Sequence, residues 1–272
     1  MNREQQVAPE ERKYESVEVA RDDSVFVIKL HRPEKFNALN ARLRDDIVAA
    51  LMSVKYDDTI RAIVVWGGTE VFAAGADLVE MAERRPMQAL RRINHSADIT
   101  ETLAGLVQPT VAAISGLALG GGLEFAMAAD IRIASNTASL GQPEINSGII
   151  PGGGATQRLT RLIGMGKAKE MILLGDRIDA YEAFRLGLVN KVVATDALYD
   201  EALSVARRLA RKPMHAMRIA KMVIDRGADA ELQQGLTLEA FAYASMFGTA
   251  DQREGAHAFI EKRQPVFKGE PA

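Results

Sequence analysis

The stretch that decides the fold is Leu119-Gly120-Gly121-Gly122-Leu123-Glu124, followed by Gly141-Gln142-Pro143-Glu144. On one continuous helix Glu124 and Glu144 would lie roughly 30 Å apart at ~1.5 Å per residue, so they can act together only if the chain turns back between them. The short, β-branched segment at residues 130–134 predicts such a return strand. The spacing therefore suggests a site built from paired carboxylates.

Strands alternate with helices around this stretch. Asn40 is a good capping residue for a helix from Ala41 to about Val54, whose apolar positions recur every three or four residues. A second helix is expected from Pro86 to Leu106, and a short one from about Gly122. Such alternation predicts an α/β core. The expected strands are residues 25–30, 62–66, 110–114, 130–134 and 189–194.

The strand signals stop after residue 195. Residues 196–272 read as a C-terminal helical region, and the apolar side chains between Leu236 and Phe247 must pack on the core or on another subunit. Residues 16–195 are the expected core domain. Residues 1–15, polar and mixed in charge, are expected to form a flexible N-terminal extension.

Composition excludes several classes of function. With 272 residues, a net charge of −2 and no cysteine, the chain offers no global basic field for nucleic acid, no disulfide and no thiolate nucleophile. The four histidines show no close metal-ligand spacing, and no apolar run approaches the ~20 residues that span a bilayer. We therefore expect no metal, no nucleic-acid partner and no membrane span, and a cytoplasmic location.

The triple glycine has two readings. Because glycine lacks Cβ, the N–H of Gly121 can approach a substrate oxygen at a helix N-terminus, as in an oxyanion hole. Alternatively, the glycines only permit close packing while Glu124 caps the first turn. Residues 71–78 form a second candidate loop, in which Asp77 can cap the next helix. Phosphate-loop, nucleophile-elbow and dinucleotide-binding motifs are incomplete.

Five segments of the chain form a recognisable set: Phe36-Asn37-Ala38-Leu39, Phe72-Ala73-Ala74-Gly75-Ala76-Asp77, residues 115–124, Leu140-Gly141-Gln142-Pro143-Glu144-Ile145 and residues 150–159. Together and in this order they resemble the crotonase (enoyl-CoA hydratase/isomerase) family, within a likeness that runs from about Ser24 to Phe267. This resemblance implies a crotonase-like α/β fold, a spiral of ββα units with a C-terminal helical trimerisation region.

The resemblance also implies site residues. By family likeness, the backbone amides of Ala76 and Gly121 form an oxyanion hole for the thioester carbonyl of an acyl-CoA. Glu124 and Glu144 match the catalytic acids, and the presence of both favours hydration over other family reactions. Gly152 matches a position at a helix N-terminus near the thioester.

The residues implied to hold coenzyme A are less regular. Val79 stands where some family members have a phosphate-binding lysine, so Lys35 and Arg32 are candidates for that contact. Phe259 and Lys262 match a region that reaches coenzyme A from a neighbouring subunit. The implied substrate-binding residues are Lys35, Ala38, Ala74, Asp77, Leu78, Gly152, Phe259 and Lys262.

The predicted reaction is reversible syn hydration of trans-2-enoyl-CoA to 3-hydroxyacyl-CoA by a lyase. It needs no cofactor, because coenzyme A arrives as part of the substrate. The alternatives are a Δ3,Δ2-enoyl-CoA isomerase or another acyl-CoA-transforming member, and a non-catalytic acyl-CoA- or RNA-binding member. The resemblance further implies a homotrimer or a hexamer made of two trimers.

Overall fold

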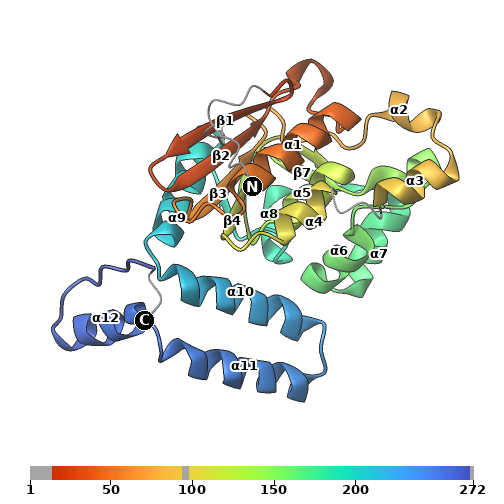
Figure 1. Ribbon diagram of the computed structural model, residues 1–272. Coiled ribbons are helices and arrows are strands. Elements are labelled where there is room, and N and C mark those ends of the chain that lie inside the picture. The colour runs from red at the N-terminus through yellow and green to blue at the C-terminus, as the bar shows by residue number, and fades with distance from the viewer. Residues whose placement is uncertain (1–13, 94–97, 270–272) are drawn as a thin grey trace, which may run out of the picture.

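The computed structural model describes residues 14–93 and 98–269 (Figure 1). A six-stranded sheet forms its centre, in the order β1-β2-β3-β4-β6-β9. The pairing of β1 with β2 is antiparallel and the remaining pairs are parallel. Its strands are β1 (Val17–Asp22), β2 (Val25–Leu30), β3 (Ala62–Trp66), β4 (Thr110–Ile114), β6 (Ile131–Ser135) and β9 (Lys191–Val193).

A smaller, three-stranded sheet stacks short strands of successive units. Its order is β5-β7-β8, formed by β5 (Leu117–Leu119), β7 (Ser139–Gly141) and β8 (Arg177–Asp179). The chain passes from β4 in the large sheet to β5 in the small sheet and then into α5 (Gly121–Met127). The next turn repeats this order with β6 and β7. This spiral of ββα units confirms the fold expected from the sequence.

The capped helix after β2 forms as predicted. Helix α1 runs over Ala41–Val54, and the side chain of Asn40 accepts a hydrogen bond from the N–H of Leu43 at 2.8 Å. The buried side chains of α1 recur at the predicted three- and four-residue spacing, which places one face of the helix against the sheet. The loop between β2 and α1 contains η2 (Pro33–Lys35). The loop that follows β3 leads into α2 (Leu78–Ala82).

The single helix predicted from Pro86 to Leu106 is wrong. The described chain has α3 (Pro86–Ile93) and α4 (Ile99–Ala104), with residues 94–97 outside the described ranges. Asp98 caps α4, because its side chain accepts from the N–H of Thr100 at 2.7 Å. An aspartate that satisfies the first amides of a helix marks a new start rather than a helix interior.

Two apolar layers cover the faces of the large sheet. The larger core lies on the side of α1, α4 and α5, and includes the fully buried rings of Phe26, Phe72 and Phe125. On the opposite side, α9 (Leu198–Ala210) packs its alanines and leucines on β2, β3, β4 and β6. The remaining core helices are α6 (Ala155–Ile163), α7 (Met165–Leu174) and α8 (Ala180–Arg185), with η4 (Thr195–Ala197) ahead of α9.

Three C-terminal helices extend away from this core at the lower side of Figure 1. They are α10 (Met214–Ala228), α11 (Leu232–Met246) and α12 (Ala250–Ile260). Helix α9 belongs to the packed core, and α10 is also attached to it, because Arg218 pairs with Asp58 at 2.8 Å and Lys221 with Asp130 at 2.9 Å. The predicted boundary at residue 196 stays a prediction. Several large apolar side chains here face outward, including Phe241 at 75% and Phe259 at 85% exposure. A surface of this kind is typical of an interface between subunits.

The N-terminal boundary also differs slightly from the sequence expectation. Residues 1–13 of the predicted extension lie outside the described residues. Tyr14 packs against the core, and the N–H groups of Glu15 and Ser16 both donate to the carboxylate of Asp46, at 2.9 and 2.8 Å. These bonds attach the start of β1 to α1.

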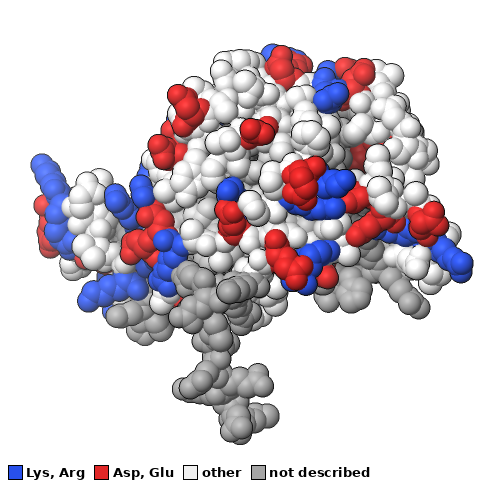
Figure 2. Space-filling view, turned by 90° about the horizontal axis from the view of Figure 1, so that it is seen from above, with Lys and Arg blue, Asp and Glu red and all other residues white. Residues whose placement is uncertain are grey.

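Acidic and basic side chains are intermixed on the face of the molecule shown in Figure 2. On that face the described residues form no continuous basic surface of the kind that binds a nucleic-acid backbone. None of the helices in the described ranges is both long and apolar enough to cross a lipid bilayer.

Candidate active site

A cavity of about 810 Å³ opens where the first two loops of the spiral meet the strand-to-helix turn after β7. Glu144, Ala76 and Gly120 lie in its wall. The predicted substrate-binding residues Lys35, Ala38, Ala74, Asp77 and Leu78 also line it. The cavity therefore joins residues that the sequence predicted separately for catalysis and for coenzyme A binding.

Glu124 does not line this cavity; it lies on the first turn of α5, is only 4% exposed, and is close enough to Glu144 for its charge to raise the pKa of that residue. Its Oε1 accepts hydrogen bonds from the N–H groups of Gly153 at 2.8 Å and Ala155 at 2.9 Å. Burial raises the pKa of Glu124, and the two amide hydrogen bonds oppose that rise. The second glycine-rich loop thus anchors a carboxylate that belongs to the first.

Glu144 lies in η3 (Pro143–Ser147), which follows β7 directly. Burial, together with a smaller contribution from the nearby charge of Glu124, raises the pKa of Glu144 to about 7. A carboxyl group with this pKa exists in both protonation states near neutral pH. It is therefore suited to give and take a proton, as a general acid or base must.

The three consecutive glycines serve different purposes. Gly120 has φ of +50°, and a Cβ on it would lie 2.6 Å from Oε1 of Glu144. A Cβ on Gly122 would collide with the carbonyl oxygen of Ala73, so this glycine permits close packing. Gly121 stands between them, at the first position of α5. The packing reading therefore holds at Gly122, although Glu124 does not cap α5, because its carboxylate accepts from Gly153 and Ala155. The oxyanion reading of Gly121 stays a prediction.

The backbone amides of Gly121 and Ala76 lie side by side. A Cβ built on Gly121 would be 4.0 Å from the nitrogen of Ala76. The N–H of Gly121 belongs to the first turn of α5, where amides have no partner within the helix. Ala76 forms a parallel bridge with Leu39 that uses the carbonyl of Gly75 and the N–H of Asp77, which leaves the N–H of Ala76 outside the pairing. This arrangement can polarise a carbonyl oxygen.

Asp77 supports the loop that carries Ala76. Its Oδ1 accepts from the N–H of Val79 at 3.1 Å and caps α2, as the sequence suggested. Its Oδ2 pairs with Nη1 of Arg32 at 2.7 Å, and Arg32 also donates to the carbonyl of Ala38 at 2.9 Å. The hydrogen bond from Arg32 lowers the pKa of Asp77. Arg32 is thus held in an internal ion pair, which favours Lys35 as the phosphate contact.

The remaining predicted residues lie elsewhere. Gly152 sits in the loop ahead of α6, two residues before its capping residue Gly154. Phe259 lies on α12 and Lys262 just beyond it, and neither lines the cavity within one chain. Their predicted contact with coenzyme A requires a second subunit and stays a prediction.

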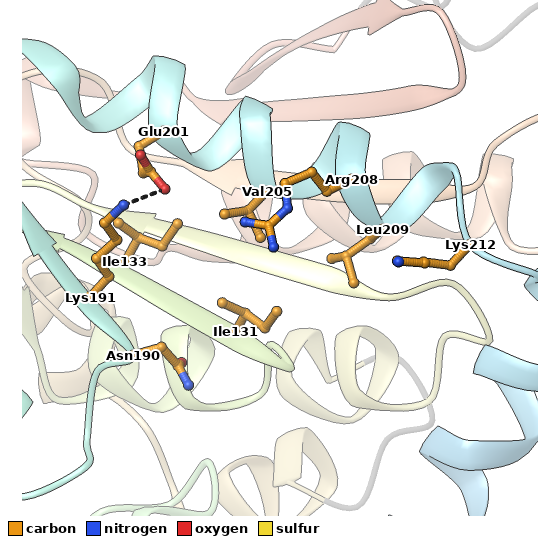
Figure 3. Close-up of a pocket in the computed structure, with 9 residues that line it drawn as sticks. All are labelled: Ile131, Ile133, Asn190, Lys191, Glu201, Val205, Arg208, Leu209 and Lys212. Carbon is orange, nitrogen blue, oxygen red and sulfur yellow. Dashed lines mark ion pairs between the residues drawn. The ribbon is translucent and has the colours of Figure 1, made fainter. Parts of the chain in front are cut away.

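A second cavity, of about 340 Å³, lies between α9 and the edge of the large sheet (Figure 3). Ile131 and Ile133 come from β6, and Lys191 of β9 pairs with Glu201 of α9 at 2.7 Å. None of the predicted site residues lines it among the described residues. It therefore has no part in the predicted chemistry.

Sequence reasoning missed three contributors to the site. Gly153 holds Glu124 through its N–H, and Gln142 is a fully buried amide beside Glu144. Arg44 on α1 brings a positive charge that opposes the rise in the pKa of Glu124. Gly153 and Gln142 were visible within quoted motifs, whereas no pattern in the sequence distinguished Arg44 from a solvated helix residue.

Comparison with known proteins places this geometry in a family. The model of the enoyl-CoA hydratase/isomerase family matches residues 20–270. The chain belongs to this family. Its ββα spiral agrees with the fold that the sequence resemblance implied, whereas the roles of the two glutamates stay predictions.

Individual relatives agree with the family assignment. A protein of Mycobacterium tuberculosis named as a probable enoyl-CoA hydratase is 44% identical over 257 residues, which is 93% of this chain and 98% of that protein. The crotonyl-CoA hydratase of Syntrophomonas wolfei is 38% identical over 255 residues, 93% of this chain and 98% of its own. The crystal structure of an enoyl-CoA hydratase from Bacillus anthracis aligns with a TM-score of 0.88 at 40% identity, covering 94% of this chain and 100% of that one.

The residues described by the structure contain no group of three or more histidine, aspartate or glutamate side chains placed to hold a metal ion. The groups in or next to the cavity that suit the predicted chemistry are the Glu144 carboxyl group, the Glu124 carboxyl group that raises its pKa, and the backbone amides of Ala76 and Gly121. This combination is suited to proton transfer next to a polarised carbonyl group.

Proposed function

We propose that the protein is an enoyl-CoA hydratase, a hydro-lyase that adds water reversibly and syn across trans-2-enoyl-CoA to give 3-hydroxyacyl-CoA. The observation that carries this proposal is the pair of carboxyl groups, Glu124 and Glu144, both with raised pKa values. The neighbouring amides of Ala76 and Gly121 support it, because Gly121 directly follows Gly120, on which a Cβ would lie 2.6 Å from Oε1 of Glu144.

The two carboxyl groups divide the proton transfers between them. Ionised Glu124 takes a proton from water while the water oxygen bonds to C3 of the enoyl group. The π electrons of the C2–C3 bond move toward the thioester, and protonated Glu144 gives its proton to C2. One O–H and one C=C π bond are replaced by a C–O and a C–H bond, and the charge moves from Glu124 to Glu144.

The amides of Ala76 and Gly121 act on the thioester oxygen. Negative charge develops on this oxygen while C2 is not yet protonated, and two N–H donors stabilise it more than they stabilise the neutral carbonyl. We further propose that Gly152, which precedes the N-terminus of α6, lies near the same thioester. The partial positive charge at the start of the helix would then add to the polarisation of the carbonyl group.

Incubation with crotonyl-CoA tests the activity. We expect the absorbance of the conjugated thioester to fall and 3-hydroxybutyryl-CoA to form. If crotonyl-CoA persists while a 3-enoyl-CoA is converted to its 2-enoyl isomer, the protein is the alternative Δ3,Δ2-isomerase. Binding of acyl-CoA or RNA with no turnover of either substrate would instead identify a non-catalytic member.

The reaction needs no metal or redox cofactor, because coenzyme A enters with the substrate. Dialysis against a strong chelator is expected to leave hydration of crotonyl-CoA unchanged. A loss of activity that added divalent metal restores would contradict this part of the proposal.

The proposed working form is a homotrimer or a hexamer of two trimers. The exposed apolar side chains of α11 and α12, among them Phe241, Phe259 and Ile260, support it. Light scattering coupled to gel filtration measures the mass directly, and a monomer at micromolar concentration would exclude this assembly. A cytoplasmic location is supported by the cysteine-free composition and is checked by cell fractionation.

A further inference from the structure

The turn that binds Glu124 consists largely of glycine. Residues 152–155, here called the glycine turn, read Gly-Gly-Gly-Ala and lead into α6. Two of its N–H groups, those of Gly153 and Ala155, donate to Oε1 of Glu124 at 2.8 and 2.9 Å. Because glycine has no Cβ, a glycine backbone can adopt many conformations. A contact from outside the glycines is therefore needed to keep both donors aimed at the carboxyl group.

The side chain of Arg158 makes such a contact. Arg158 is the fourth residue of α6, and its Nη1 donates to the carbonyl of Gly153 at 3.1 Å. Helical side chains lean toward the N-terminus of their helix, which lets Arg158 reach back over the glycine turn. Gly154 leaves room for it, because φ there is +110° and a Cβ would collide with Nη1. Gly153 is thus bound on both sides, its N–H by Glu124 and its carbonyl by Arg158.

Helix stability alone does not explain an arginine at this position. A positive charge in the first turn of a helix lies near the positive end of the helix dipole, which is unfavourable. Nη2 of Arg158 also pairs with Oε1 of Glu101 on α4 at 2.7 Å, but the Glu101 side chain is 67% exposed, and surface pairs of this kind contribute little. The bond from the charged guanidinium to the Gly153 carbonyl is the stronger interaction.

We propose that Arg158 is a positioning residue that holds the glycine turn so that its two amides bind Glu124 as an ionised base. This inference rests on the proposed function, in which Glu124 takes a proton from water. The two N–H donors favour the carboxylate over the carboxylic acid, and they fix its direction. Arg158 acts through Gly153 and needs no contact with the substrate.

Other charged groups face Glu124 from the elements around α5. Among the described residues, Arg44 on α1 lowers its pKa and Asp98, at the start of α4, raises it. Glu144 lies in η3, and β5, which also packs against α5, carries no charge. The further charged residues on α1, α4 and α6 are Arg42, Asp45, Asp46, Glu101, Arg158 and Arg161. The effect of Arg158 is expected to pass through the two amides.

The variant Arg158→Met keeps much of the length of the side chain and removes its charge and its donors. We expect kcat for crotonyl-CoA to fall about 10-fold, with KM changed less than about two-fold. Because loosened amides favour the Glu124 carboxylate less, the acid limb of kcat/KM should move upward by about half a pH unit to one unit. The basic limb assigned to Glu144 should move less.

Arg161→Met is the matched control on the same helix. Arg161 also makes a surface ion pair, with Asp229 at 3.4 Å, but its backbone acceptor is the carbonyl of Gln157 rather than the glycine turn. This variant should leave kcat and the acid limb unchanged. Equal kcat values and equal acid limbs for Arg158→Met and Arg161→Met would overturn the proposal.

Two further variants separate the two bonds of the guanidinium. Glu101→Gln removes the ion pair and leaves the bond to Gly153, so it should move the acid limb less than Arg158→Met does. Arg158→Lys retains one charged donor and should restore part of the lost kcat. A Glu101→Gln variant that reproduces the full effect of Arg158→Met would assign the role to the ion pair and overturn the proposal.

Backbone amides give a readout without turnover, which separates a failure of this inference from a failure of the proposed hydratase activity. In NMR spectra of the substrate-free protein, the N–H signals of Gly153 and Ala155 should shift with the protonation of Glu124. Their pH midpoint should be higher in Arg158→Met than in Arg161→Met, and both amides should exchange hydrogen at least about 10-fold faster.

The outcomes of the amide measurement are distinct. An unchanged midpoint together with unchanged exchange would overturn the inference even in a protein that hydrates crotonyl-CoA. The expected changes in a protein that does not hydrate crotonyl-CoA would support the hold of Arg158 on the glycine turn and contradict the hydratase proposal. If Arg158→Met does not fold, Arg158→Lys should show smaller changes in the same direction, and their absence would overturn the inference.

Discussion

Gly120 and Glu144 lie so close together that a single added Cβ on the glycine would come within 2.6 Å of Oε1 of the carboxyl group. The complementary relationship holds on the other loop, where a Cβ on Gly153 would come within 2.6 Å of Oε2 of Glu124. Each carboxyl group thus rests against a glycine of the other glutamate's loop.

Gly120→Ala should displace Glu144 and strain the backbone, because φ at this position is +50°. We expect kcat for crotonyl-CoA to fall at least about 10-fold and the protein to lose stability by about 1 kcal/mol or more. Steady-state kinetics and urea unfolding measure the two effects. Gly166→Ala is the control, since a Cβ there meets nothing within 4 Å. Full activity in Gly120→Ala would show that the close contact is unimportant.

Glu144→Gln should lower kcat at least about 100-fold while acyl-CoA binding stays largely intact, as expected when a general acid is removed. The measurement is turnover of crotonyl-CoA together with the dissociation constant of a non-reactive acyl-CoA. Glu182→Gln on α8, whose carboxylate pairs with Arg185 at 2.6 Å, serves as the control. Near-normal kcat in a folded Glu144→Gln protein would remove Glu144 from the mechanism.

The hydration rate should depend on pH through both carboxyl groups. Because Glu144 must be protonated and its pKa is about 7, kcat/KM should decline as the pH rises above about 7. On the acid side, kcat/KM should decline as Glu124 becomes protonated, at a pH above the ordinary glutamate range because burial raises its pKa. A rate that stays flat from pH 5 to pH 9 would contradict these roles.

Stability should respond to the same groups with a definite sign. The pKa of Glu144 rises from 4.5 in the unfolded chain to about 7 in the fold, so the folded state holds the proton more tightly. The free energy of unfolding should therefore fall as the pH rises from about 4.5 to 7, and level off above that range. Urea unfolding should show a smaller fall for Glu144→Gln than for the wild type. An equal fall in both proteins would assign the effect to other groups.

Lys35→Ala tests the coenzyme A contact. Lys35 lines the cavity from η2, where Arg32 is already paired with Asp77. We expect KM to rise about 3- to 10-fold with kcat nearly unchanged, and the difference to shrink at high salt because the contact is electrostatic. Lys169→Ala on α7 is the comparison variant. A fall in kcat alone would argue against a binding role.

Local sequence signals were sufficient to predict helices and strands that are defined by the pattern of neighbouring residues. The Asn40 cap and the spacing of Leu43, Ile47 and Leu51 predicted α1 to the residue, and the apolar run at 62–66 predicted β3. The three-residue strands β5, β7 and β8 carry too few residues to show a period, so only tertiary pairing reveals them.

The sequence likewise predicted the candidate residues of the site but not the partners that surround them. Family motifs identified Glu124, Glu144, Ala76 and Gly121 as candidates, whereas the partners that set their properties come from distant positions. Gly153 lies 29 residues after the glutamate it binds, and Arg44 comes from α1. Such contacts follow from how the turns of the spiral stack, which spacing along the chain does not encode.

Glu124 lies against Gly153 and Glu144 lies against Gly120, so each carboxyl group depends on a glycine from another turn of the spiral. Neither carboxyl group has its environment until two successive turns of the spiral have closed on each other. During refolding, recovery of turnover should therefore follow the docking of residues 117–127 with residues 139–155, and lag behind the appearance of helical signal. We therefore expect a partly folded chain to be inert toward thioesters, and reactivity to appear only when these turns of the fold are complete.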